Sequence, residues 1–228
     1  MGKEIEKIAL QRNHEIFCTI DNENDWAKNF EIIANADVAI DFSIPGSIVN
    51  NILSFFKADI PVVTGTTGWN TNFEEIKKIC LQQKKALFFA SNFSIGMNLL
   101  FAINNKLAKM MNSFPQYDVK IEEAHHVQKL DSPSGTAITL ANDIVKNVDR
   151  KEKWSNNASD FNNFLEIKSI RQGNITGIHN VIYNSNVDTL EIKHTAINRT
   201  GFALGAVMAA EWLYGKKGVF GMNDLLNL

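Results

Sequence analysis

The sequence predicts an α/β fold in two parts: a parallel sheet covered by helices, and a second, α+β part with a mostly antiparallel sheet. In the first 94 residues, short and fully apolar segments alternate with segments of helical periodicity. This alternation is typical of parallel strands that are buried on both faces. From residue 117 onward, several segments alternate apolar with polar residues, which is typical of strands with one exposed face.

Composition narrows the classes of function. The 228 residues are 45% hydrophobic and carry a net charge of −2. This fits a protein with a hydrophobic core, and it lacks the basic surface that nucleic-acid binding requires. No run of about 18 apolar residues occurs, so we expect no membrane partner. Cys18 and Cys80 lack metal-binding or redox spacing, and we expect reduced thiols in a cytoplasmic protein.

The N-terminal segment has the spacing of a dinucleotide-binding unit. Residues 1–11 predict an amphipathic helix, and the apolar segment 15–20 predicts a short strand that ends at Asp21. An acid about 20 residues after a glycine at a helix start is where Rossmann-type domains bind the adenosine ribose. Gly2 and Asp21 have this spacing. We therefore expect the parallel sheet to be of the Rossmann type.

The glycine fingerprint of such a domain is only partly present. A dinucleotide fingerprint consists of a first strand followed by G-x-G-x-x-G, whereas this sequence offers Gly2 alone at that place. On the usual strand length, we expect about ten further residues, a strand and a glycine-rich loop, upstream of Met1.

Three further parallel strands are predicted in the segments 36–42, 60–69 and 86–94. A turn and helix at 43–56 and a helix at 73–82 lie between them. Ligands of such sheets bind at the carboxyl ends of the strands. The segments GTTG and ASNF lie at two of these ends. From the sequence pattern alone, each is equally a plain turn or a binding loop.

A long helix is predicted at residues 96–111, where an apolar stripe has helical spacing and is expected to belong to the core. The stripe consists of Leu99, Leu100, Ile103, Leu107 and Met110.

The chain is organised around residues 122–141, where a predicted strand at 117–124 and a predicted helix at 136–145 flank a loop with candidate catalytic groups. His125 and His126 titrate near neutral pH, and Lys129 adds a cation. Ser132 or Ser134 stands where a helix N-cap belongs, and the N–H groups that follow it form a site for a carboxylate or phosphate.

The histidine pair by itself is more often structural than catalytic, and Pro-Ser-Gly alone is an ordinary turn. Adjacent histidines point apart, and no further histidine or cysteine lies close in sequence, so we predict no metal site.

The C-terminal part predicts a surface loop at residues 147–163, then three strands at 164–171, 177–184 and 188–196, and a helix at 199–214. His179 and His194 alternate with apolar residues, which favours structural roles for both.

The run AHHVQKLDSPSGTA resembles the signature of the 4-hydroxy-tetrahydrodipicolinate reductase (dihydrodipicolinate reductase) family. The histidine pair, the lysine four residues after the first histidine and the Ser-Gly-Thr all occur in the family's order and spacing. The resemblance implies that His125 donates or accepts a proton and that Lys129 is a second proton donor or a substrate contact. It assigns the carboxylates of a small dicarboxylate substrate to His126, Gly135 and Thr136.

The resemblance also implies a nicotinamide cofactor and the residues that bind it. Asp21 repels a 2′-phosphate and no lysine or arginine follows it before Lys28, so NADH is expected to be preferred, although many family members also accept NADPH. The implied cofactor-binding residues are Gly2, Asp21, Gly65, Thr66, Thr67, Ala90, Ser91, Asn92 and Phe93.

The family resemblance implies a cofactor domain of residues 1–94 and 200–228 and a substrate-binding domain of residues 95–199. It also implies a homotetramer built on the second sheet, and it places Arg171 and the His179 segment near the substrate pocket. The implied activity is the nicotinamide-dependent reduction of 4-hydroxy-tetrahydrodipicolinate to tetrahydrodipicolinate in diaminopimelate and lysine biosynthesis. Two alternatives stay open: a dicarboxylate-binding module without catalysis, and a Rossmann dehydrogenase that acts on another small acid.

Overall fold

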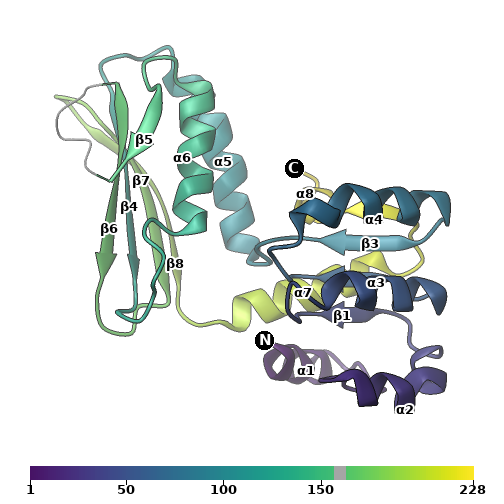
Figure 1. The fold of residues 1–228 in the computed structure, drawn as a ribbon. Helices are drawn as coiled ribbons and strands as arrows, with labels where there is room; N and C mark the ends of the chain where they lie inside the picture. Colours follow the sequence, from purple (N-terminus) through teal and green to yellow (C-terminus); the bar gives the residue numbers. More distant parts are fainter. Residues whose placement is uncertain (157–162) are drawn as a thin grey trace. The chain divides into compact units, whose positions relative to one another are not determined.

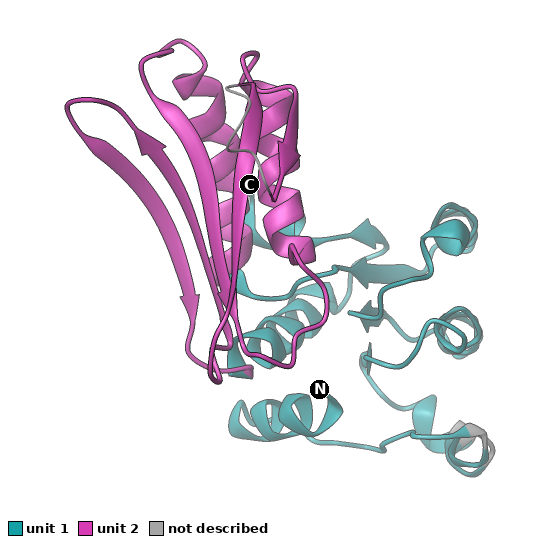
Figure 2. Ribbon diagram, turned by 60° about the vertical axis from the view of Figure 1, so that its left-hand side comes forward, with its two compact units in different colours: residues 1–95, 200–228 teal, residues 96–199 magenta. Residues whose placement is uncertain are grey.

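The computed structural model describes residues 1–156 and 163–228 (Figure 1). The chain divides into two compact units, coloured separately in Figure 2. Unit 1 consists of residues 1–95 and 200–228, and unit 2 consists of residues 96–199. The chain passes between them at residues 95–96 and 199–200, next to the boundaries predicted from the sequence. The assignment of one unit to the cofactor and the other to the substrate stays a prediction.

Unit 1 is a four-stranded, fully parallel sheet with the strand order β1-β2-β3-β9. Its strands are short, and residues of β2 and β3 are almost completely buried because helices cover both faces. The strands are β1 (Ala39–Asp41), β2 (Val62–Thr64), β3 (Ala86–Phe89) and β9 (Gly218–Phe220). The helices are α1 (Gly2–Gln11), α2 (Glu23–Ile33), α3 (Ile48–Lys57), α4 (Asn70–Gln82), α7 (Thr200–Leu213) and α8 (Met222–Leu226).

The predicted strand at residues 15–20 is wrong. This segment has no strand conformation, and β1 is the edge of the sheet on its side. A strand needs a hydrogen-bonded neighbour, and within residues 1–156 and 163–228 no segment pairs with the outer edge of β1. The sequence pattern therefore shows that the segment is apolar, but it does not show whether the segment has a strand to pair with.

Alternating residues of the strands supply two separate cores in unit 1. Val63 and Phe88 face α1, α7 and α8, whereas Val62 and Leu87 face α3 and α4. This is the period of two that a strand imposes on its side chains. Two cores on opposite faces explain why the strands have no polar face, as the sequence predicted.

Helix α7 approaches the loop after β3 closely because it is rich in small residues. A Cβ atom on Gly205 would lie 1.8 Å from the backbone oxygen of Phe93, whereas a Cβ on Gly201 would meet nothing within 4 Å. Gly205 is therefore required by the contact between α7 and this loop.

Unit 2 is a five-stranded mixed sheet with the order β5-β6-β4-β7-β8. The pairs β4–β7 and β7–β8 are antiparallel, as expected, whereas β6 runs parallel to β4 and β5 runs parallel to β6. Helix α6 carries the chain back between β4 and β6, and such a crossover makes the two strands parallel. The elements are α5 (Ile95–Met111), β4 (Asp118–His125), α6 (Gly135–Asn147), β5 (Lys153–Ser155), β6 (Phe164–Arg171), β7 (Gly177–Asn184) and β8 (Thr189–Ala196).

The core of unit 2 lies between α5, α6 and one face of this sheet. Leu100 and Leu107 of the predicted apolar stripe belong to it, but Leu99, Ile103 and Met110 are 40%, 51% and 58% exposed. The prediction that the whole stripe is core is wrong for these three residues. Helix α5 is apolar on more than one side, and the sequence pattern alone did not show which side would face α6.

The predicted loop at residues 147–163 contains the short strand β5, and its residues 157–162 lie outside the described part of the chain. Over the described residues, no helix combines the length and the apolar character that crossing a membrane requires.

We predict that Gly205→Ala destabilises the protein, because its methyl group would collide with the backbone oxygen of Phe93. Overpacking of this kind costs about 1–3 kcal/mol of unfolding free energy, which urea denaturation would measure. Gly201→Ala on the same helix is the matched control, and it should be neutral or stabilising by up to about 1 kcal/mol. Equal stabilities of the two variants would contradict the close approach of α7.

Candidate active site

The central feature of unit 2 is a polar end on an otherwise apolar sheet face. Along β4, Val119 and Ile121 are buried in the core, and the next two residues on the same face are Glu123 and His125. The sequence predicts His125 in the loop after the strand. In the structure it is instead the last residue of β4. A strand end in a core fixes this side chain more firmly than a loop would.

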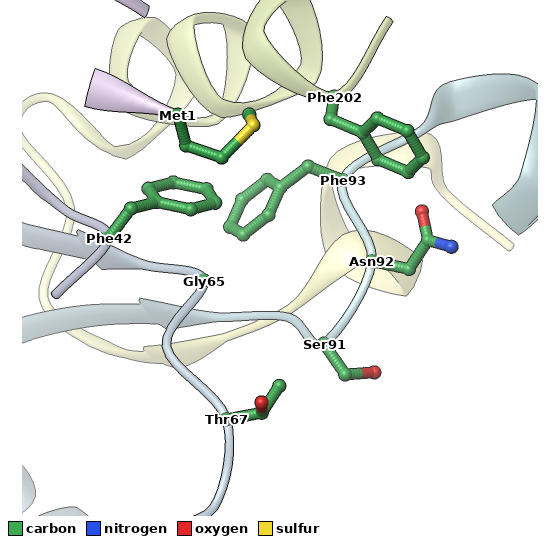
Figure 3. Close-up of a pocket in the computed structure, with 8 residues that line it drawn as sticks. All are labelled: Met1, Phe42, Gly65, Thr67, Ser91, Asn92, Phe93 and Phe202. Atoms are coloured by element: carbon green, nitrogen blue, oxygen red, sulfur yellow. The ribbon is translucent and has the colours of Figure 1, made fainter. Parts of the chain in front are cut away.

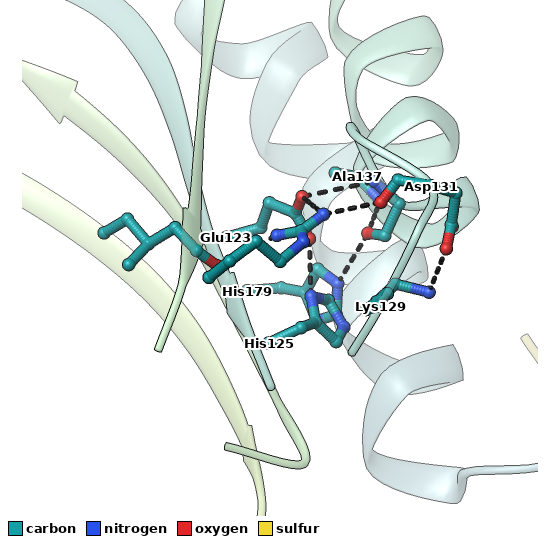
Figure 4. A network of polar contacts seen from close by, with 9 residues as sticks. Glu123, His125, Lys129, Asp131, Ala137 and His179 are labelled. Carbon is teal, nitrogen blue, oxygen red and sulfur yellow. Dashed lines mark hydrogen bonds and ion pairs between the residues drawn. The ribbon is translucent and has the colours of Figure 1, made fainter. Parts of the chain in front are cut away.

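Glu123 is a buried carboxylate with partners on both of its oxygens (Figure 4). Oε2 lies 2.6 Å from Nδ1 of His125, and Oε1 accepts hydrogen bonds from Arg171 Nη2 at 2.9 Å and from the backbone N–H of Ser134 at 3.2 Å. Burial alone would raise the pKa of Glu123, but the polar groups of His125, Ser169, Arg171 and Ser134 around the carboxylate outweigh it and hold this pKa well below its ordinary value.

His179 on β7 completes the buried cluster. It pairs with Glu123 in the strand register, and its ring meets the ring of His125 edge to face at 5.1 Å between centroids. Its Nε2 lies 3.2 Å from Ser134 Oγ. Burial, with the nearby His125 adding to it, lowers the pKa of His179 to about 4, so His179 is neutral at pH 7.

Ser134 is the N-cap of α6 and connects this helix to the cluster. Its Oγ accepts a hydrogen bond from the backbone N–H of Ala137 at 3.2 Å, which selects it over Ser132 as the cap. The first N–H groups of any helix lack partners inside the helix, and here they belong to Gly135 and Thr136. A Cβ on Gly135 would meet nothing within 4 Å, so the backbone is open to a ligand at this point.

Lys129 and His126 lie next to the cluster rather than inside it. Nζ of Lys129 is 2.8 Å from Oδ1 of Asp131, and this contact is the main reason why the pKa of Asp131 is lowered. The backbone oxygen of Asp131 accepts a hydrogen bond from Arg171, so the loop is tied to β6. His126 is half-buried.

Three residues of the cluster have the spacing of possible metal ligands. Glu123, His125 and His179 each have one possible ligand atom within 4.8 Å of the others. The guanidinium of Arg171, however, already binds the carboxylate, and its positive charge opposes a second cation at the same oxygens.

In unit 1, a pocket of about 260 Å³ opens at the carboxyl ends of the strands (Figure 3). Five predicted cofactor residues line it, and an aromatic and apolar wall faces them. The lining consists of Gly65, Thr67, Ser91, Asn92 and Phe93, together with Met1, Phe42 and Phe202.

The structure does not bring the other predicted cofactor residues into this pocket. Ala90 is buried, Gly2 is exposed directly after Met1 at the border of the pocket, and Asp21 is exposed and does not line it. Thr66 is also buried, and its hydroxyl donates to Asp41 at 3.1 Å. A Cβ on Gly65 would overlap the ring of Phe42 at 2.2 Å, so this glycine is required by internal packing.

The lining of the pocket combines apolar rings with hydroxyl groups. Phe42 and Phe93 pack against each other with 5.5 Å between their ring centroids, and Thr67 and Ser91 supply the hydroxyl groups. Met1, the N-cap of α1, also lines the pocket. The start of α1 therefore borders it, and helix N-termini favour phosphate oxygens.

Two family models match the chain. Dihydrodipicolinate reductase, N-terminus, matches residues 1–93, and Dihydrodipicolinate reductase, C-terminus, matches residues 96–226. The chain belongs to the dihydrodipicolinate reductase family. The predicted family, the predicted fold class and the predicted reductase activity are thereby confirmed, and the cofactor of this reductase is a pyridine nucleotide.

Similar reductases occur among curated proteins and solved structures. The 4-hydroxy-tetrahydrodipicolinate reductase of Christiangramia forsetii is 47% identical, covering 100% of this chain and 94% of the relative. The enzyme of the same name from Clostridium tetani is 35% identical, covering 100% and 93%. The dipicolinate-bound dihydrodipicolinate reductase from Paenisporosarcina sp. TG-14 has the same fold, with a TM-score of 0.77 at 20% identity over 96% of this chain and 92% of that chain.

The sequence analysis assigned no role to Glu123, although the alternation of residues in its strand indicates that it is buried. The alternation of β4 places this carboxylate on the buried face, two residues before His125. An acid on a buried face needs partners, and the nearest candidate in sequence was this histidine. His179 was expected to be structural, and it is buried and hydrogen-bonded as a structural histidine is.

We predict that His179 makes the reductase less stable as the pH falls. The pKa of histidine is about 6.5 in an unfolded chain but about 4 for His179 in the fold. Between these values the unfolded chain binds a proton that the folded chain does not. The contribution is therefore fully present above about pH 6.5 and is lost as the pH falls toward about 4.

Urea unfolding of wild type and His179→Asn at about pH 7 and about pH 4.5 measures this effect. The loss of unfolding free energy on acidification should be smaller in the variant by roughly 2 kcal/mol. Equal losses in the two proteins would show that His179 is not buried in its neutral form.

Proposed function

We propose that this chain reduces 4-hydroxy-tetrahydrodipicolinate to tetrahydrodipicolinate with NADH as the preferred cofactor and His125 as the proton donor. The observation that carries the proposal is the buried Glu123–His125 pair, hydrogen-bonded to the N-terminal end of α6. This places a titratable group and an anion-binding backbone in one cluster. Reduction of a dicarboxylated imine requires both.

The cofactor supplies the hydride when it is bound, and the protein manages the proton and the charge. Loss of the 4-hydroxyl group as water gives the conjugated ring to which the hydride adds. The addition leaves negative charge on the ring, and a nearby acid removes this charge by donating a proton. His125 is the group proposed for this step. Lys129 is the proposed second donor or substrate contact, and it lies in the loop that follows β4, where it pairs with Asp131.

The start of α6 and His126 are proposed to hold the two carboxylates of the substrate. Gly135 and Thr136 present N–H groups that the helix itself does not use. The absence of a side chain on Gly135 keeps the approach open. Arg171 neutralises Glu123, so the buried acid does not repel an anionic ligand at this place.

The preference for NADH is proposed from Asp21. This carboxylate is exposed, and it stands directly before Asn22, whose side chain caps α2 by accepting from the N–H groups of Asn24 and Asp25. An exposed acid at this place suits a free 2′-hydroxyl and repels a 2′-phosphate. NADPH is proposed as the poorer cofactor.

The remaining proposals rest on the family resemblance. They are a homotetramer formed through the sheet of unit 2, a cytoplasmic location, and closure of the two units during turnover. The exposed and partly exposed residues of β8 are the structural feature that supports contact with another subunit.

We predict that His125→Gln lowers turnover by about 10²–10⁴-fold, the usual range for an acid–base residue. Oxidation of NADH, followed by absorbance with 4-hydroxy-tetrahydrodipicolinate as substrate, measures it. His14→Gln is the control, because His14 is an exposed histidine that pairs with Glu211 in unit 1, and its turnover should equal that of wild type. Undiminished turnover in His125→Gln would remove this residue from the mechanism.

We predict that Asp21→Asn narrows the preference for NADH by about tenfold in kcat/KM, because the charge that opposes the 2′-phosphate is lost. Steady-state kinetics with both cofactors measures the ratio. Asp37→Asn, which changes another exposed acid of unit 1, should leave the ratio unchanged. A wild-type enzyme that prefers NADPH would contradict the role of Asp21.

A further inference from the structure

We propose that Glu123 is the positioning residue for the proton-donating histidine: its carboxylate binds Nδ1 of His125 and thereby presents Nε2 to the substrate. The inference rests on the proposed role of His125 and adds a residue to which the sequence motif gave no role. Glu123 itself acts through His125 and does not touch the reacting atoms.

The contact between the two side chains determines which nitrogen carries the hydrogen. Oε2 of Glu123 lies 2.6 Å from Nδ1 of His125, and the side chains are 0% and 9% exposed. An ionised carboxylate only accepts hydrogen bonds, so Nδ1 must be protonated. The proton that His125 gives up and takes back is therefore the one on Nε2.

Glu123 cannot turn away from His125, because two other elements bind its second oxygen. Arg171 at the end of β6 donates to Oε1 at 2.9 Å, and the N–H of Ser134 before α6 donates to the same atom at 3.2 Å. These contacts keep the carboxylate ionised in a buried place. They fix the carboxylate relative to β6 and to the start of α6, and the carboxylate in turn fixes the imidazole ring of His125.

Gly177 leaves the space beside Nε2 free of a side chain. A Cβ on Gly177 would lie 3.2 Å from this nitrogen, so any other residue there would crowd it. His179 bounds the ring from the side at an interplanar angle of 71°. A neutral His179 places no positive charge against the proton that His125 must carry.

A carboxylate held behind a histidine is a recurrent means of fixing its tautomer and ring orientation in catalytic and metal sites. In this chain the same arrangement occurs without a metal role, because Arg171 occupies the outer side of the carboxylate. The Glu123–His125 pair therefore serves proton transfer rather than ion binding.

The tautomer can be read directly in the wild-type enzyme. With ¹⁵N-labelled histidine, and His125→Gln to assign the signals, neutral His125 should be in the Nδ1-protonated form. Glu123→Gln should increase the share of the Nε2-protonated form. An Nε2-protonated His125 in the wild type would overturn the proposal, and this measurement does not depend on the folding of any Glu123 variant.

Kinetics test the consequence for catalysis. Glu123→Gln should lower kcat by about 10- to 100-fold, the usual cost of losing such a carboxylate, with an unchanged KM for NADH. Glu122→Gln is the matched control: Glu122 is the neighbouring acid on the other face of β4 and pairs with Lys120 at 3.1 Å. It should retain the kcat and the tautomer of the wild type.

The inference and the proposed function fail separately. Undiminished turnover in His125→Gln removes the donor role, whatever the tautomer. A large loss in His125→Gln together with wild-type kcat in Glu123→Gln retains the donor and overturns the positioning role of Glu123.

Discussion

The candidate active site depends on one buried charge, the carboxylate of Glu123. An ionised acid in a protein interior is costly unless hydrogen bonds compensate for the lost water, and here β4, β6 and the start of α6 each supply a donor. Because the buried carboxylate needs a donor at each oxygen, His125, Arg171 and Ser134 must lie next to it. The apolar core below them holds the sheet and α6 in the relative position that the network needs.

Unit 1 uses the same device at the carboxyl ends of its strands. Asp41 is buried and accepts from the N–H of Ser43, the amide of Asn51 and the hydroxyl of Thr66. The hydrogen bond from Thr66 to Asp41 thus fixes the loop of Gly65 and Thr66. The next residue, Thr67, lines the pocket. In both units, a hydrogen-bonded interior acid positions residues that border a candidate binding site.

The sequence pattern predicted most elements of the fold, because strands with two buried faces and helices with clear caps have local signatures. It also located the cluster around His125, since the histidine pair and the N-cap are contiguous in sequence. It failed where the outcome depends on distant partners. Over the part of the chain that the structure describes, residues 15–20 have no neighbouring strand. Ile103 is apolar but 51% exposed, and the buried Glu123 is paired with Arg171 of a distant strand. Such pairings between remote segments leave no trace in local periodicity.

The discontinuity of unit 1 has a consequence for biosynthesis. Strand β9, the last in the chain, pairs with β3 through the register of Leu87 with Val219, and α7 covers the same sheet. A ribosome releases all of residues 96–199 before either segment emerges. Unit 1 must therefore wait, with one face of its sheet open, until α7 and β9 have been made. The open face makes nascent chains, rather than the finished enzyme, the state most exposed to aggregation and to chaperone binding.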